Sequence, residues 1–139
     1  MDRDFKAVFP IQPRFRDTDA MGHINNAVYL SYLELGRVEY WRKLFGAMNH
    51  LDFPFILARV EIDYRSPAKI EDELVIGMRC AEMRGASFDF LCEIWDKKTG
   101  RTIASAKTVQ VSYDYRKGKP VPLSDHYREK ILDFEKSAR

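Results

Sequence analysis

Acidic, amide and imidazole side chains gather in one polar stretch near the N-terminus. Asp17 and Asp19 stand close together, and His23, Asn25 and Asn26 follow them just before a long apolar run. The run predicts a helix, so these side chains would lie beside its first N–H groups, which carry partial positive charge. Such N–H groups polarise a carbonyl or stabilise an oxyanion, and a nearby carboxylate serves as a nucleophile or as a general base for water.

The same residues also have a purely structural interpretation. Asp, Thr and Asn are ordinary turn and helix-capping residues, and composition alone slightly favours that role. Glu34 and Arg37 further along predict an ion pair on the helix, with Glu34 facing a pocket as the alternative. The chain has no phosphate-binding loop, no dinucleotide-binding glycine motif, no Gly-x-Ser-x-Gly and no His-Glu-x-x-His, which excludes the enzyme classes that those motifs mark.

The helix that must position the polar stretch is predicted over Ala27–Phe45. Twelve of its 19 residues are apolar. The predicted apolar stripe comprises Leu30, Leu33, Tyr40 and Leu44, widened by Tyr29, Tyr32, Gly36 and Val38. A helix that is apolar on most sides is expected to be buried. The Asn25-Asn26 pair supplies a favoured N-cap residue, and Gly46 is expected to end the helix.

After this helix the apolar residues begin to alternate, which is typical of strands. Strands are predicted over Phe55–Ser66, Glu73–Met83, Ser87–Asp96 and Arg101–Tyr115, with an edge strand or irregular entry in Phe5–Arg16 and a short helix over Ser124–Ala138 capped by Ser124. Consecutive strands joined by tight turns are antiparallel. We therefore expect an α+β fold, a single domain over residues 1–139, in which one sheet wraps around the long helix.

Composition excludes several kinds of partner. The formal net charge of +2 is too small to indicate a nucleic-acid or membrane-surface binder. No apolar run is long enough to span a bilayer and the acidic N-terminus shows no signal peptide, so we expect a cytoplasmic protein. Cys80 and Cys92 are expected to be small buried hydrophobic residues in a reducing compartment. The three histidines are far apart in the sequence, so neither a metal nor another cofactor is expected.

The polar stretch and helix together form a longer pattern. It reads Arg16-x-x-Asp19-x-x-Gly22-His23-Ile24-Asn25-Asn26-x-x-Tyr29-Leu30-x-Tyr32-x-Glu34-x-x-Arg37. Further pieces follow in order: Ile62-Asp63-Tyr64-x-x-Pro67-Ala68, Asp72-Glu73-Leu74, Ser87-Phe88 and Val121-Pro122-Leu123. Over nearly the whole chain this pattern resembles the 4-hydroxybenzoyl-CoA thioesterase family. The resemblance implies the hotdog fold, in which five or six antiparallel strands wrap one long helix, and hydrolysis of an acyl-CoA thioester to a free acid and CoA.

The resemblance also implies roles for individual residues. The catalytic carboxylate of the family's Asp-x-x-Gly element falls on Asp19, as nucleophile or general base, and Asp17 is then structural. Backbone N–H at the helix start, near Asn26, would polarise the thioester carbonyl, and Tyr29 would lie beside the acyl pocket. The implied substrate-binding residues are Gly22, His23, Asn25, Asn26, Tyr29 and Ser87. The His-Ile-Asn-Asn form is shared with long-chain acyl-CoA thioesterases and resembles acyl-carrier-protein thioesterases, which argues against an aromatic acyl group.

The family further implies an assembly. Hotdog relatives pair two chains into one continuous sheet with each active site across the seam, so we expect a homodimer or homotetramer. The expected partner is an acyl-CoA or acyl-carrier-protein thioester, with CoA phosphates met by surface cations, of which Lys69, Arg79, Arg84 and Lys97 are candidates. Two other functions stay open: a hotdog hydratase or dehydratase, for which His23 is the nearby histidine, and a non-catalytic acyl-CoA or acyl-carrier-protein binder.

Overall fold

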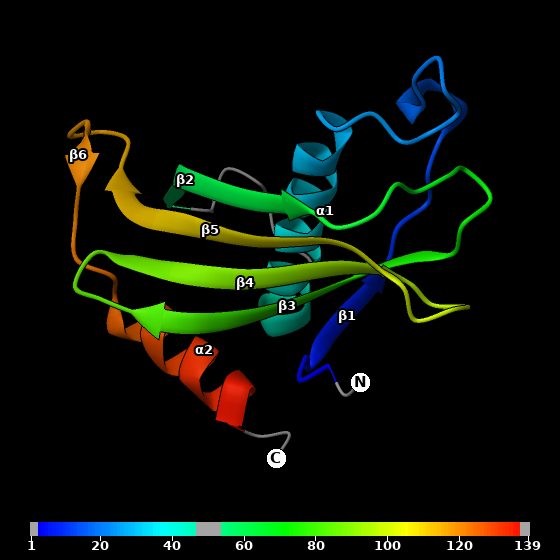
Figure 1. Ribbon diagram of the computed structural model, residues 1–139. Coiled ribbons are helices and arrows are strands. Elements are labelled where there is room, and N and C mark those ends of the chain that lie inside the picture. The colour runs from blue at the N-terminus through cyan, green and yellow to red at the C-terminus, as the bar shows by residue number, and fades with distance from the viewer. Residues whose placement is uncertain (1–2, 47–53, 137–139) are drawn as a thin grey trace.

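One antiparallel sheet forms the body of the molecule (Figure 1). The computed structural model describes residues 3–46 and 54–136. The strands are β1 (Ala7–Pro10), β2 (Phe55–Tyr64), β3 (Leu74–Met83), β4 (Ser87–Asp96), β5 (Thr102–Asp114) and β6 (Lys119–Pro120). Their order is β1-β3-β4-β5-β2, with β6 paired to β5, and every ladder is antiparallel. The predicted α+β sheet is confirmed, because alternating apolar residues bury one face of each long strand.

Helix α1 (Val28–Phe45) crosses one face of this sheet (Figure 1). Its buried residues are Tyr29, Tyr32, Leu33, Gly36, Tyr40, Trp41 and Leu44. The prediction of a helix buried on most sides is wrong, since Leu30, Leu35 and Val38 are 46%, 56% and 37% exposed. The sheet covers only one side of the helix, so the apolar residues on the opposite side remain in contact with solvent.

Gly36 lets α1 approach the sheet closely. A Cβ atom at this position would stand 2.6 Å from the Met78 sulfur and 3.0 Å from the Ile76 Cδ1 atom. Both of these β3 side chains are fully buried. The missing side chain is therefore what allows helix and strand to touch, and any larger residue must displace packed atoms.

The ends of α1 show how the polar stretch joins the helix. The N-cap position is Ala27 and not an asparagine, which corrects the capping prediction. Asn25 still satisfies the exposed donors, because its side-chain oxygen accepts the Ala27 N–H at 2.9 Å and its carbonyl accepts the Val28 N–H at 2.9 Å. Gly46 ends the helix with a φ of 78°, as expected of a glycine in the left-handed region.

Helix α2 (Asp125–Lys136) packs against β3 and α1. Ser124 caps it weakly, since its hydroxyl accepts the Tyr127 N–H at 3.4 Å. Glu135 ties it to the body: one carboxylate oxygen accepts the Tyr40 hydroxyl at 2.6 Å and the Cys80 N–H at 2.9 Å. The predicted end of this helix, Ala138, lies outside the described residues. In the ranges that are described, no helix is long and apolar enough to cross a membrane.

The two cysteines are free thiols on the inner face of β3 and β4. Cys92 is buried and Cys80 is partly buried, close to the prediction of small hydrophobic residues. Desolvation raises the pKa of each thiol to about 12. Because the thiolate is the reactive form, these cysteines are expected to be chemically inert at neutral pH.

Candidate active site

The loop before α1 holds the Asp19 carboxylate in a fixed orientation. Its Oδ1 atom accepts the Met21 N–H at 2.8 Å and the His23 N–H at 3.1 Å, while the Asp19 N–H donates to the His23 carbonyl at 2.7 Å. Gly22 closes this turn with a φ of 81°, a conformation that favours glycine. Within the described ranges no group donates a hydrogen bond to Oδ2 of Asp19, so that oxygen is available for chemistry.

Asp17 has a different environment from its neighbour. It is only 2% exposed, and its carboxylate accepts hydrogen bonds from the Arg14 N–H, the Arg14 guanidinium and the Tyr32 hydroxyl. Burial alone would raise the pKa of Asp17, but these three hydrogen bonds together lower it below the usual value. The geometry is that of a structural carboxylate that anchors the loop to α1, in agreement with the role predicted for it.

Asp17→Asn is expected to lower the free energy of unfolding by about 1–3 kcal/mol near neutral pH, because the buried amide replaces a hydrogen-bonded carboxylate. The folded-state pKa of Asp17 lies below its unfolded value of about 3.9. The stabilisation is therefore fully present above that unfolded value and is lost as the pH falls through the folded-state pKa. Urea melts of both proteins at neutral and at acidic pH test this, and a stability gap that widens in acid would contradict it.

A cavity of about 270 Å³ opens beside Asp19. Its lining residues are Asp19, His23, Ile24, Asn26, Tyr29, Tyr64, Arg65, Ser66 and Pro67. Four of the predicted site residues, Asp19, His23, Asn26 and Tyr29, thus share one cavity. Gly22 and Asn25 are not part of the lining; they shape the loop and the helix start instead.

Two tyrosines form the apolar wall of the cavity. The rings of Tyr29 and Tyr64 meet edge to face, with centroids 5.5 Å apart. Desolvation raises the pKa of Tyr29 to about 12, so its hydroxyl stays protonated at neutral pH. The Tyr64 hydroxyl donates to the Asn26 carbonyl at 3.0 Å and so links the end of β2 to the start of α1.

The Asn26 backbone N–H lies at the helix start, where a polarising group is expected. Among the residues that the structure describes, none accepts a hydrogen bond from the Asn26 N–H. Asn26 and Asp19 both line the same cavity. Hydrolysis of a thioester needs a donor for the carbonyl oxygen and a base or nucleophile, and these two residues carry groups of both kinds.

Several lining residues had no role in the prediction from sequence. Tyr64, Arg65, Ser66 and Pro67 come from the end of β2 and the segment after it. The signal was present as the Tyr64-x-x-Pro67 piece, which follows a strand. The segment lies at the site because it pairs with the Asp19 loop, through an isolated bridge between His23 and Lys69 and the bond from the Ile24 N–H to the Ala68 carbonyl.

Other predicted residues lie elsewhere. Ser87 is the first residue of β4 and pairs with Val111 of β5. The site lies at the other end of the sheet, beside Tyr64 of β2, which is level with Ile94 of β4 because both pair with Ala104 of β5. At roughly 3.3 Å per residue, Ser87 is about 23 Å from that end, so it does not reach the cavity of its own chain. Its hydroxyl accepts a hydrogen bond from the Arg84 guanidinium at 2.8 Å.

The cationic candidates are also dispersed. Of the four, Lys69 lies next to the site through its bridge to His23. Arg84 is engaged by Asp89 and Glu82, and Lys97 lies in the β4–β5 turn. Arg79, in the middle of β3, is not part of the cavity lining either. Arg65, which the sequence did not single out, does line the cavity.

In the described ranges, Glu34 and Arg37 do not form the ion pair that the sequence predicts. Glu34 instead lies on a groove of about 450 Å³ between α1 and the segment that follows β1, closer to the alternative of a pocket-facing side chain. In the same ranges, no group of three or more His, Cys, Asp or Glu side chains is arranged to hold a metal ion.

Comparisons with known proteins show the family to which the chain belongs. A sequence profile of the thioesterase-like superfamily matches residues 13–131. The long-chain acyl-CoA thioesterase FadM of Escherichia coli is 30% identical, over 91% of this chain and 97% of its own length. The acyl-CoA thioesterase YbgC of Haemophilus influenzae is 32% identical, over 81% of this chain and 85% of its own length.

A solved structure agrees with the sequence comparisons. A thioesterase from Thermus thermophilus, crystallised with coenzyme A and zinc, superposes with a TM-score of 0.86 and 32% identity, covering 96% of this chain and 97% of its own. The chain belongs to the thioesterase-like superfamily, and it has the hotdog fold that the resemblance implied.

Proposed function

We propose that this protein is an acyl-CoA thioesterase that uses Asp19 to release a free acid and CoA. The observation that supports this most is the cavity that Asp19 and Asn26 both line, the latter with a backbone N–H for which the described residues offer no acceptor, in a chain of the thioesterase-like superfamily. The names of the relatives support the acyl-CoA class. The bound CoA of the Thermus relative supports the same leaving group.

The geometry supports two routes with the same products. In the first, Asp19 takes a proton from water, the water oxygen attacks the thioester carbonyl, and the tetrahedral oxyanion is stabilised by the Asn26 N–H. The C–S bond then breaks, and CoA leaves as a thiolate that recovers the proton. In the second, Oδ2 of Asp19 attacks directly, CoA thiolate leaves, and water hydrolyses the resulting mixed anhydride.

The acyl group is proposed to be aliphatic. The His-Ile-Asn-Asn form and the similarity to a relative named as a long-chain thioesterase support this choice. Tyr29 and Tyr64 give the cavity its apolar wall, and the protonated Tyr29 hydroxyl introduces no charge there.

The test uses one saturated and one α,β-unsaturated acyl-CoA. A thioesterase releases thiol from both, whereas a hydratase consumes the conjugated double bond and releases no thiol. Tight binding with no change to either substrate identifies a non-catalytic binder, and activity on acyl-carrier-protein thioesters alone would replace CoA as the leaving group. Thiol release from the saturated acyl-CoA is the expected result.

We further propose that two copies pair through β2. This strand is an edge of the sheet, hydrogen-bonded on one side to β5. Antiparallel pairing of two β2 strands would set the Tyr64 end of one copy beside the Phe55 end of the other. Because Ser87 begins β4 near that Phe55 end, it would approach the Asp19 cavity from the second copy.

Light scattering tests the assembly. The expected mass is two or four times the 16.3 kDa of one chain, because an unpaired edge strand of this length is a site for association. A particle with the mass of a single chain at working concentrations would contradict the shared site.

The proposed location is the cytoplasm. Cys80 and Cys92 are unpaired thiols, which is typical of proteins in a reducing compartment.

A further inference from the structure

The segment between β2 and β3 forms one wall of the candidate site and supports the Asp19 loop. Arg65, Ser66 and Pro67 line the cavity. Ala68 is fully buried, and its carbonyl accepts the Ile24 N–H at 2.8 Å. The next residue, Lys69, pairs with His23, whose N–H and carbonyl both bond to Asp19. The position of Asp19 therefore depends on the position of this segment.

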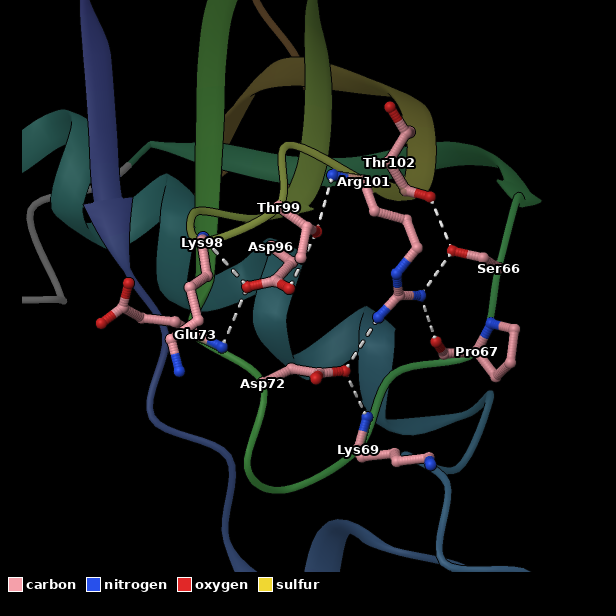
Figure 2. A network of polar contacts seen from close by, with 10 residues as sticks. All are labelled: Ser66, Pro67, Lys69, Asp72, Glu73, Asp96, Lys98, Thr99, Arg101 and Thr102. Atoms are coloured by element: carbon pink, nitrogen blue, oxygen red, sulfur yellow. Dashed lines mark hydrogen bonds and ion pairs between the residues drawn. The ribbon is translucent and has the colours of Figure 1, made fainter.

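The Arg101 side chain hydrogen-bonds to this segment at Ser66, Pro67 and Asp72 (Figure 2). One guanidinium nitrogen, Nη1, donates to the Pro67 carbonyl at 2.6 Å and to the Ser66 hydroxyl at 2.8 Å. The other, Nη2, donates to Asp72 Oδ2 at 3.1 Å, and the same oxygen accepts the Lys69 N–H at 2.8 Å. One planar group thus holds both ends of the segment at once, a geometry that a flexible ammonium cannot reproduce.

The base from which Arg101 reaches is itself fixed. Asp96 is 4% exposed, and its carboxylate accepts the Glu73 N–H, the Lys98 N–H and the Thr99 hydroxyl. The Thr99 hydroxyl oxygen in turn accepts the Arg101 N–H at 3.1 Å (Figure 2). The β4–β5 turn is therefore bonded to the start of β3, and Arg101 starts from a rigid support.

The charge of the Arg101–Asp72 pair is a minor part of its effect. The Arg101 side chain is 39% exposed, and partly exposed ion pairs contribute little to stability. What the guanidinium supplies is a fixed distance between residues 66–67 and residue 72. Ala68 and Lys69, the residues that meet the Asp19 loop, lie between these two anchor points.

We propose that Arg101 is a positioning residue for the reaction: it holds the 66–72 segment so that Asp19 and Tyr29 face the cavity. The inference rests on the proposed thioesterase function. Arg101 is far from Asp19 in sequence, makes no hydrogen bond to its carboxylate and does not itself line the cavity, but it holds two residues that do, Ser66 and Pro67. A misplacement of about 1 Å at a reacting group costs up to 10²-fold in rate, so a small relaxation of the segment is sufficient to lower turnover.

The first test is a kinetic comparison of Arg101→Met and Arg101→Lys with the wild type. Arg101→Met is expected to lower kcat by about tenfold or more with little change in KM, and Arg101→Lys to recover part of the loss by keeping one of the contacts. Arg116→Met, at an exposed arginine of the β5–β6 turn, is the matched control and should behave as wild type. A merely structural role would lower Tm while leaving kcat per folded molecule unchanged, and that result would overturn the proposal.

The second test does not depend on activity. Hydrogen exchange of the Ile24 amide reports its bond to Ala68, so exchange is expected to be faster in Arg101→Met and in Ser66→Ala than in wild type. Ser66→Ala removes one of the Arg101 contacts together with the bond from the Ser66 hydroxyl to the Thr102 carbonyl, and it serves if Arg101→Met does not fold. If Ile24 exchanges at the wild-type rate in a folded variant, Arg101 does not hold the segment and the proposal is refuted. If the variants do exchange faster but the wild-type protein hydrolyses no acyl-CoA, only the proposed thioesterase function is refuted.

Discussion

Asp19→Asn is expected to lower kcat for acyl-CoA hydrolysis by about 10²–10⁴-fold, the range found for loss of a positioned acid–base group. The substitution tests the carboxylate alone, because the asparagine side-chain oxygen can still accept the Met21 and His23 N–H groups. The loop therefore keeps its shape, and only the charge and basicity of the carboxylate are lost. Steady-state thiol release, with Tm measured on the same samples, checks the result.

The control for this variant is another exposed aspartate far from the cavity. Asp133→Asn removes the same charge from α2 and is expected to leave kcat and KM unchanged. CoA should bind the Asp19→Asn variant as it binds wild type, since the backbone groups of the site remain in place. Full activity of Asp19→Asn would show that a different group performs the chemistry, while the family membership of the chain would stand.

Gly36→Val is expected to have the largest effect on stability, about 2–3 kcal/mol, because it forces atoms into a filled core. A Cβ at position 36 already meets the Met78 sulfur and the Ile76 methyl group, and valine adds two further methyl groups. Part of the cost is offset, since valine loses less backbone entropy than glycine in a helix. Chemical denaturation of variant and wild type measures the difference.

Gly85→Val is the matched comparison for the core substitution. Gly85 has an ordinary backbone conformation, and a Cβ there would meet no atom within 4 Å. The same side chain added at this turn should therefore change stability by much less than at position 36. Equal stabilities of the two variants would mean that α1 does not contact β3 as closely as described.

Local patterns predicted the elements well because local physics determines them. The helix predicted over Ala27–Phe45 begins one residue later, and the strand Ser87–Asp96 is found with the predicted bounds. Alternating apolar residues and turn residues are sufficient for this, since each strand buries one face. The exposure of Leu30 was missed because a helical stripe does not show which side the sheet will cover.

The candidate site was predicted only where it is continuous in sequence. Asp19, His23, Asn26 and Tyr29 come from one loop and the helix that follows it, so a motif contains them all. Tyr64–Pro67 and Arg101 reach the site by strand pairing and by a side-chain contact, which no local pattern encodes. Ser87 was assigned by resemblance, and the fold places it at the opposite end of β4.

The most direct test of the central claim is hydrolysis of a panel of acyl-CoA substrates of short, long and aromatic acyl groups by the wild-type protein. CoA release would be followed with a thiol reagent, and the free acid quantified in the same reactions. The expected result is equimolar CoA and free acid, with aliphatic substrates preferred over aromatic ones. Absence of thiol release across the whole panel would contradict the proposal that the Asp19 cavity is a thioesterase active site.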